Sequence, residues 1–186
     1  FDRFLEQSID WKKIMPLINN VNLMSYDLVS GFSKVTGHHT GLYSTEKQKQ
    51  SADNAIRYFL NEKLPVNKII IGSAFYARGW DSVSTENNGL YQQGVFKYFI
   101  PYKHFDRRLN SDSGFTFYMD STALAPFAYN STTKTFFTFD DKRSVTEKMN
   151  YVKKMKLGGI MFWELTLDSP VDGLLDTIDK ERRRKQ

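Results

Sequence analysis

NLMSYD, residues 22–27, has the letters of a buried strand that ends in a tyrosine and an acid. Asn22, Leu23 and Met24 suit a strand that is covered on both faces. A carboxylate in an apolar core costs free energy unless it is paired or hydrogen-bonded. We therefore expect a strand at about 21–27, with Tyr26 and Asp27 at its rim, where they face a ligand.

Two further apolar runs have the same character, KIIIGSAFY at 68–76 and IMFWEL at 160–165. Helical patterns lie around these strands, because apolar residues recur there at intervals of three and four. Those helices are expected at 10–18, 51–62 and 144–156, and from Ser169 onward. Strands that alternate with helices indicate an α/β protein with a parallel sheet or barrel.

The ends of these helices have recognisable signals. Asp10 is expected to cap the first helix. Ser144 and Glu147 have the spacing of a capping box at the start of the third. Ser169 and Pro170 are expected to begin the last helix. The residues expected to face inward from that last helix are Val171, Leu174, Leu175 and Ile178.

The segment at about 81–140 differs from the rest, because its composition turns polar and aromatic. It contains GFTFYMD, APFAYN and TFFTFD, which are typical of short antiparallel strands. We predict a small α+β insertion here, between barrel portions at 1–80 and 141–186. Within the insertion, Asn130 begins an Asn-Ser-Thr triplet that fits the glycosylation acceptor pattern.

Bulk composition excludes several classes of protein. The chain has 186 residues, 40% of them hydrophobic, which is enough for a sizeable core. It has no cysteine, so there is no disulfide framework. No apolar run approaches the ~20 residues that a membrane span needs. The net charge is +5, but much of it lies in KERRRKQ at 180–186, the pattern of a solvated helix end. We expect no nucleic-acid partner and no membrane span.

Aromatic and charged side chains gather where the three apolar strands end. In α/β folds and barrels, the carboxyl ends of the strands carry the functional site. The residues concerned are Met24, Tyr26, Asp27, Tyr76, Arg78, Trp163 and Glu164.

These residue types point to a carbohydrate. A flat indole such as Trp163 can stack on the C–H face of a sugar, and a tyrosine adds a hydroxyl group. Arg78 and Asp27 can form hydrogen bonds with hydroxyl or amide groups. The alternative is that the aromatic residues are packing residues and that Arg78 and Asp27 form an internal pair.

At these residues the chain resembles glycoside hydrolase family 18, the chitinases and chitinase-like proteins. NLMSYD is similar to the Met-x-Tyr-Asp strand of that family. GSAFYARGW at 72–80 looks like the next strand, and GGIMFWEL at 158–165 looks like the last barrel strand. The stretch from 138 to 164 resembles the usual lead into that last strand.

A loop carries a fourth similarity. TGHHTGLY at 36–43 is similar to the family's Gly-His-Asn-x-Pro-Leu-Tyr loop, with His39 and Gly41 in place of the more usual Asn and Pro. The resemblance extends from about Phe4 to Asp179, and its four motifs occur in the right order.

The resemblance implies a partial TIM (β/α)8 barrel with the α+β insertion between strands seven and eight. Met24 to Asp27 would lie on strand six, Ile69 to Arg78 on strand seven, and Ile160 to Glu164 on strand eight. Eight strands close such a barrel, so strand six would present an open edge. The missing half of the barrel, or another chain, would cover that edge.

The resemblance also implies roles for the site residues. The family cleaves β-1,4 links between N-acetylglucosamine units with retention, and the acetamido oxygen of the sugar attacks the anomeric carbon. The implied catalytic residues are Tyr26, which holds the acetamide, and Asp27, which binds the sugar or orients its neighbours. The implied substrate-binding residues are Met24, Tyr76, Arg78 and Trp163. Glu164 has either a structural role or a site role, and no metal or cofactor is implied.

One part of the family pattern does not occur in this sequence. The family's general acid is the glutamate that closes an Asp-x-x-Asp-x-Asp-x-Glu strand, and no stretch of the chain has that spacing. A glycosidase needs a positioned acid to protonate the leaving oxygen. We therefore interpret the chain as the C-terminal half of a chitinase-like catalytic domain that is secreted or held at the cell envelope. The alternatives are a catalytically inactive carbohydrate-binding relative and a structural fragment without separate activity.

Overall fold

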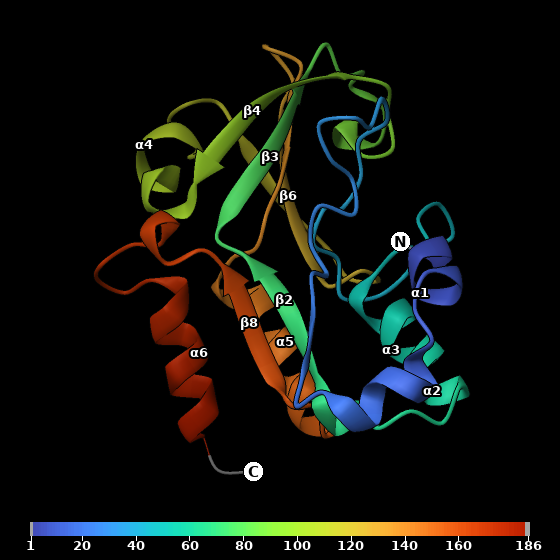
Figure 1. Ribbon diagram of the computed structural model, residues 1–186. Coiled ribbons are helices and arrows are strands. Elements are labelled where there is room, and N and C mark those ends of the chain that lie inside the picture. The colour runs from blue at the N-terminus through green and yellow to red at the C-terminus, as the bar shows by residue number, and fades with distance from the viewer. Residues whose placement is uncertain (1, 185–186) are drawn as a thin grey trace.

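The computed structural model describes residues 2–184 and is built on a three-stranded parallel sheet. β2 (Ile69–Ala74) lies between β1 (Val21–Leu23) and β8 (Gly159–Trp163). Leu23 pairs with Ile71, and Ala74 pairs with Trp163. The fold is therefore α/β, and the carboxyl ends of β2 and β8 point toward a second sheet (Figure 1).

Two helices cover one face of the parallel sheet. α3 (Ala52–Asn61) begins at Ser51, whose hydroxyl accepts a hydrogen bond from the Asn54 N–H. α5 (Lys142–Met155) lies beside it in the same layer. The shared core consists of Leu23, Ala52, Ala55, Ile56, Phe59, Ile69, Ile71, Tyr151 and Val152.

The start of α5 differs from the prediction that Ser144 caps it. The helix begins about one helical turn earlier in the sequence, and Asp141 is its N-cap. The Asp141 carboxylate accepts from the Ser144 N–H at 2.7 Å, and the Ser144 hydroxyl accepts from the Asp141 N–H at 3.0 Å. Ser144 is therefore the third helical residue of a capping box, not its first.

The last helix also begins later than predicted. α6 (Leu174–Arg183) follows Gly173, because the Asp168 carboxylate accepts from the N–H groups of Leu174 and Leu175 at 2.9 Å each. Leu174 and Ile178 are buried as expected, but Val171 and Leu175 are exposed, so their predicted inward position is wrong. Residues 185–186 of the basic tail lie outside the described residues.

Short helical segments precede the first two strands. α1 (Asp2–Gln7) precedes α2 (Trp11–Ile14), which Asp10 caps as predicted by accepting from the Lys13 N–H at 3.2 Å. Short 3-10 turns occupy Met15–Leu17 and Val66–Lys68. No helix of the described part of the chain is long and apolar enough to cross a membrane.

The second sheet is antiparallel and has five strands in the order β4-β3-β7-β6-β5. β5 (Thr116–Asp120), β6 (Ala125–Asn130) and β7 (Thr135–Thr138) confirm the three strands that the sequence predicts. β3 (Tyr76–Asp81) and β4 (Val95–Pro101) were not predicted as strands of this sheet.

The segments that join these strands are short. They include α4 (Phe105–Arg108) and 3-10 turns at Glu86–Gly89 and Tyr102–His104. A further 3-10 turn at Leu165–Leu167 follows β8 and leads to α6. Asn130, at the end of β6, is buried, and its side-chain N–H donates to the Ser113 carbonyl at 3.0 Å. The fold therefore buries the acceptor asparagine of the glycosylation triplet, whereas Ser131 and Thr132 are exposed.

Two strands stop earlier than the sequence suggests. The expected strand at 21–27 ends at Leu23, because Ser25 turns back and donates its N–H to the Leu23 carbonyl at 2.7 Å. The expected strand from Ile69 to Arg78 ends at Ala74. Phe75 changes partners there: its N–H donates to the Trp163 carbonyl at 3.0 Å, and its carbonyl accepts from the Tyr102 N–H at 2.9 Å. The chain thus passes directly from one sheet into the other.

Candidate functional site

Asp27 lies at the centre of a cluster between the two sheets. It follows β1 in a left-handed backbone conformation, with φ of 56°. Its two carboxylate oxygens accept from Arg78 Nε at 2.8 Å and from Arg78 Nη2 at 2.7 Å. This two-point contact sets the orientation of the carboxylate relative to Arg78.

The rings of Tyr76 and Phe99 pack against the Arg78 guanidinium. The Tyr76 hydroxyl donates to Asp27 Oδ1 at 2.8 Å, and the Tyr76 side chain is only 2% exposed. Its ring stacks on Phe99 with centroids 4.9 Å apart. The Arg78 guanidinium lies 5.2 Å from the Tyr76 ring centroid and 5.8 Å from that of Phe99, within the range of a cation–π contact. Tyr76 thus contacts Asp27 rather than the open rim.

These contacts keep Asp27 ionised. Burial raises its pKa, but His39, Arg78 and Tyr76 together outweigh burial and hold that pKa below its ordinary value. Burial raises the pKa of Tyr26 and of Tyr76, so both phenols stay neutral. Asp27 can therefore accept hydrogen bonds at neutral pH, and it cannot serve as a proton donor.

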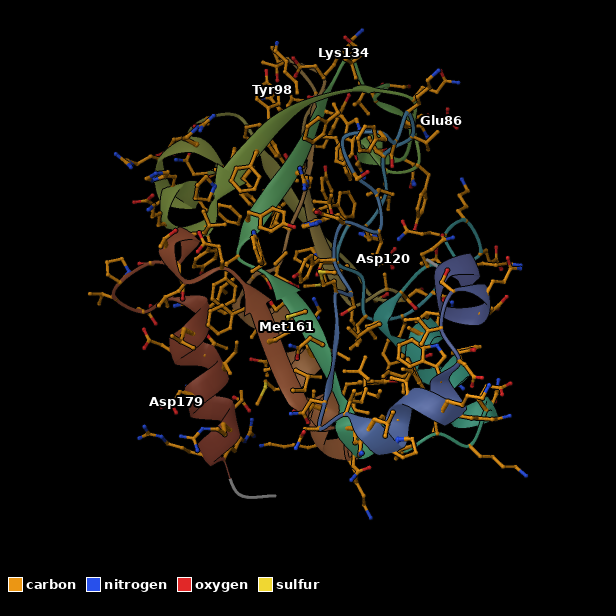
Figure 2. The ribbon with its side chains drawn as sticks, in the orientation of Figure 1. Glu86, Tyr98, Asp120, Lys134, Met161 and Asp179 are labelled. Carbon is orange, nitrogen blue, oxygen red and sulfur yellow. The ribbon has the colours of Figure 1, made fainter. Side chains whose placement is uncertain are left out.

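Tyr26 differs from Tyr76 in one respect that matters for binding. Its ring packs in a cluster with Ala74, Tyr76 and Met161 (Met161 is labelled in Figure 2). A Cβ on Gly72 would lie 2.7 Å from that ring, so the glycine makes room for it. Among the described residues, the Tyr26 hydroxyl has no hydrogen-bond partner. That hydroxyl is free to bind a ligand.

Met24 and Trp163 lie at the same edge of the parallel sheet. Met24 follows β1 and is 63% exposed, while Trp163 ends β8 and is 56% exposed. The Trp163–Glu164 peptide bond is cis. The Glu164 carboxylate accepts from the Thr166 hydroxyl. Two large apolar side chains therefore stand open to solvent where β1 and β8 end.

A buried ion pair contacts the carboxyl end of β2. Asp140 and Lys148 are both fully buried, with Lys148 Nζ 2.7 Å from Asp140 Oδ2. The same oxygen accepts from the Ala74 N–H and from the Ser73 hydroxyl, each at 2.9 Å. Burial raises the Asp140 pKa, but the Lys148 ammonium outweighs burial and lowers it. The ion pair thereby holds the end of β2, beside which Tyr26 packs.

The structure brings four of the expected residues together, namely Tyr26, Asp27, Tyr76 and Arg78. Arg78 and Tyr76 reach the cluster from β3 of the second sheet, not from the end of β2. One neighbour was not predicted: His39 Nδ1 lies 3.5 Å from Asp27 Oδ1. Its only signal in the sequence is the departure from the family's usual asparagine. The part of the chain that the structure describes has no group of three or more His, Cys, Asp or Glu residues that could hold a metal ion.

The polar and aromatic cluster lies where the parallel strands end, which is the edge that carries the functional site in α/β folds and barrels. Residues 1–168 match the family model for glycosyl hydrolases family 18, and the chain belongs to that family. Chitinase A1 of Niallia circulans is 31% identical over 173 residues, which cover 84% of this chain and 25% of that protein. Chitotriosidase-1 of Mus musculus is 28% identical, with 84% and 35% covered.

Solved structures agree with this assignment. The glycoside hydrolase family 18 N-acetylglucosaminidase from Paenibacillus barengoltzii matches with a TM-score of 0.83 and 34% identity, over 91% of this chain and 50% of that one. The chitinase ChiW from Paenibacillus sp. str. FPU-7 matches with a TM-score of 0.89 and 33% identity, over 96% and 21%. The chain therefore spans half or less of each of these proteins.

Proposed function

We propose that the chain forms the sugar-binding part of a chitinase-type catalytic domain that acts on β-1,4-linked N-acetylglucosamine. The observation that carries the proposal is the contrast between two tyrosines. The hydroxyl of Tyr76 is used by Asp27, whereas the hydroxyl of Tyr26 is free beside an ionised Asp27. A free phenol next to a fixed carboxylate suits the acetamide group of such a sugar.

The family resemblance supplies the proposed roles of the residues, and the contacts described above are compatible with them. Tyr26 would donate to the acetamido oxygen and hold it in line with the anomeric carbon, as substrate-assisted retaining hydrolysis requires. Asp27 would accept from a sugar hydroxyl or amide. Trp163 would stack on the reacting sugar, and Met24 would line the pocket. Arg78 would contact the neighbouring sugar, and Tyr76 would act through Asp27.

The position of the parallel sheet is part of the proposal. β1, β2 and β8 would be strands six to eight of a (β/α)8 barrel, with barrel portions at 1–80 and 141–186 and an insertion at 81–140. β1 and β8 are the edge strands of their sheet. The rest of the barrel, or another chain, would cover those edges.

The proton donor would come from outside this chain, since no residue here has the spacing of the family's acid. The whole protein would then be a glycosidase. The alternative, a chitinase-like carbohydrate-binding protein without the acid, is distinguished by the residue at the end of the fourth barrel strand. One relative, ChiW, is described as cell-surface-expressed, which favours a location outside the cell or at its envelope.

The test is to measure binding and turnover with the purified chain. We expect an N-acetylglucosamine tetramer to bind wild type, and Tyr26→Phe to weaken binding about three- to tenfold, because one hydrogen bond is lost. Tyr58→Phe, an exposed-side substitution on α3, is the matched control and should change nothing. A chromogenic chitobioside should not be hydrolysed by the isolated chain.

Either of two results would contradict the proposal. Failure of wild type to bind the tetramer would show that the cluster is a packing feature. Clear turnover that Tyr26→Phe reduces would show that this chain carries an acid, or that two chains together form a working site.

A further inference from the structure

His39 is a buried side chain whose polar atoms are unexplained. It is 0% exposed, and neither ring nitrogen has a hydrogen-bond partner in the part of the chain that the structure describes. Most buried polar side-chain atoms have such a partner, because leaving one unpaired costs free energy. The nearest acceptor is Asp27 Oδ1, 3.5 Å from His39 Nδ1, which is longer than an ordinary hydrogen bond.

The ring of His39 is held in place by its backbone and by its neighbours. The His39 N–H donates to the Thr138 hydroxyl at 3.2 Å, and its carbonyl accepts from the Leu28 N–H at 3.0 Å. The next residue, Thr40, donates its hydroxyl to Asp140 at 2.9 Å. The ring also lies against Tyr76, with centroids 5.3 Å apart. The imidazole is thus confined on several sides, so any shortening of the 3.5 Å distance comes from the Asp27 carboxylate, which is partly exposed.

The charged groups around His39 decide which nitrogen carries the proton. Burial lowers the pKa of His39, and Lys148 at the back of the ring lowers it further, while Asp27 and Asp140 oppose both. The remaining titratable neighbour, Tyr76, is neutral. A neutral imidazole has one N–H. A proton on Nδ1 faces the Asp27 carboxylate, whereas a proton on Nε2 would direct a lone pair at it.

The two oxygens of Asp27 are not equivalent. Oδ1 accepts from Tyr76 and from Arg78 Nε, and it faces His39. Oδ2 accepts only from Arg78 Nη2 among the described residues. A ligand group therefore finds its place at Oδ2.

We propose that His39 is a positioning residue for Asp27. Its neutral Nδ1–H is a reserve donor for Oδ1, and the contact closes to hydrogen-bond length when a sugar group competes for Oδ2 and the carboxylate shifts. The inference rests on the proposed function in taking Asp27 as a sugar-binding residue. It adds a third donating residue to Asp27, after Tyr76 and Arg78, from the loop at 36–43.

The first experiment separates positioning from packing. His39→Phe keeps a ring against Tyr76 and removes both nitrogens. No hydrogen bond of the free protein is lost, so the midpoint of thermal unfolding should stay the same or rise. Affinity for an N-acetylglucosamine tetramer should nevertheless fall about three- to tenfold. His39→Asn, whose amide can present an N–H near the position of Nδ1, should restore affinity to within about twofold.

The neighbouring histidine provides the matched control. His38 is also buried, but its Nε2 lies 2.9 Å from Asp120 on the second sheet. His38→Phe should lower stability and leave the affinity of the folded protein unchanged. Wild-type affinity in His39→Phe, or equal losses in the two histidine variants, would overturn the inference.

A second experiment does not depend on sugar binding. Nitrogen-15 NMR of the wild-type chain, with signals assigned by their loss in His39→Phe, should show a neutral imidazole protonated at Nδ1. In Asp27→Ala the preference for Nδ1 should disappear. A proton on Nε2 in wild type, or no change in Asp27→Ala, would overturn the inference about His39. Absence of tetramer binding by wild type, together with the expected NMR result, would instead refute only the proposed function.

Discussion

Arg78 and Asp27 form a two-point ion pair across the junction of the two sheets, with N–O distances of 2.8 and 2.7 Å. Asp27 belongs to the loop after β1 of the parallel sheet, and Arg78 belongs to β3 of the antiparallel sheet. The pair therefore ties the candidate site to the relative placement of both sheets (Figure 1). The placement of the Asp27 carboxylate therefore depends on a residue 51 positions away in the sequence.

The first prediction concerns the geometry of that pair. Arg78→Lys keeps the charge but loses the planar fork and its overlap with Tyr76. We expect the free energy of unfolding to fall by about 1–2 kcal/mol, measured by urea denaturation. Arg57→Lys is the control, because Arg57 also pairs with an aspartate, Asp53, but is largely exposed. Equal effects of the two substitutions would show that the two-point contact adds nothing.

The second prediction concerns the buried ion pair behind β2. Lys148→Met leaves the Asp140 carboxylate buried and unpaired, which typically costs about 3–5 kcal/mol. The double change Asp140→Asn with Lys148→Met should recover part of that loss, because no buried charge then remains. Lys142→Met, which breaks an exposed pair with Asp172, should have a much smaller effect. A double variant no more stable than Lys148→Met would contradict this account; urea denaturation of all three decides it.

The third prediction concerns acid stability. Asp120, labelled in Figure 2, is hydrogen-bonded to His38, to the Ala123 N–H and to the Thr122 N–H. The His38 contact is the main cause that lowers its pKa from 3.8 to about 2. A lowered carboxyl pKa stabilises the fold above the unfolded value and is lost as the pH falls toward the folded value.

Asp120→Asn should therefore destabilise the chain by about 1 kcal/mol above pH ~4, less than the full pKa shift corresponds to, because the partly exposed carboxylate is screened by solvent. The difference from wild type should shrink between pH ~4 and ~2 and then vanish. Thermal unfolding of both proteins across this range measures the effect. A difference that stays constant down to the acid limit would mean that the carboxylate charge does not matter there.

The sequence predicts the type of each element of the parallel sheet well, because its strands are continuous apolar runs. It does not predict where β2 ends. That end depends on the backbone of Phe75, whose N–H bonds to Trp163 and whose carbonyl bonds to Tyr102. Both partners are distant from Phe75 in the sequence. β4 was missed because its exposed positions include the apolar residues Val95 and Phe99, so polar and apolar letters do not alternate along it.

In the candidate site, too, the sequence predicts some features and not others. Tyr26, Asp27 and Trp163 were expected from strand ends and from the family resemblance. The Arg78–Asp27 pair, which the sequence offered only as the alternative to a ligand site, is present. The contacts of Asp27 with Tyr76 and His39 were not expected, since these residues come from β3 and from the loop at 36–43. His39 has no periodicity or motif of its own, so only the packed structure places it beside Asp27.

The last prediction uses the exposure of the three tryptophans. Trp11 and Trp80 are buried, whereas Trp163 is 56% exposed at the end of β8. A change in tryptophan fluorescence on adding an N-acetylglucosamine tetramer should therefore come from Trp163. Trp163→Ala should abolish that signal and weaken binding, measured by calorimetry, about tenfold, or ~1.4 kcal/mol. Trp163→Phe should lose the signal but keep most of the affinity, because a ring can still stack.

Phe117→Ala is the control for a general loss of exposed aromatic surface. Phe117 is also partly exposed, but it lies on β5, the edge strand of the second sheet farthest from β4. The Phe117→Ala substitution should leave unchanged both the fluorescence response to the tetramer and the affinity for it. If Phe117→Ala weakened binding as much as Trp163→Ala, the sugar would bind the second sheet rather than the strand ends. If Trp163→Ala left affinity unchanged, the stacking role of Trp163 would be wrong, while the hydrogen-bonding roles of Tyr26 and Asp27 would still be tested by their own variants.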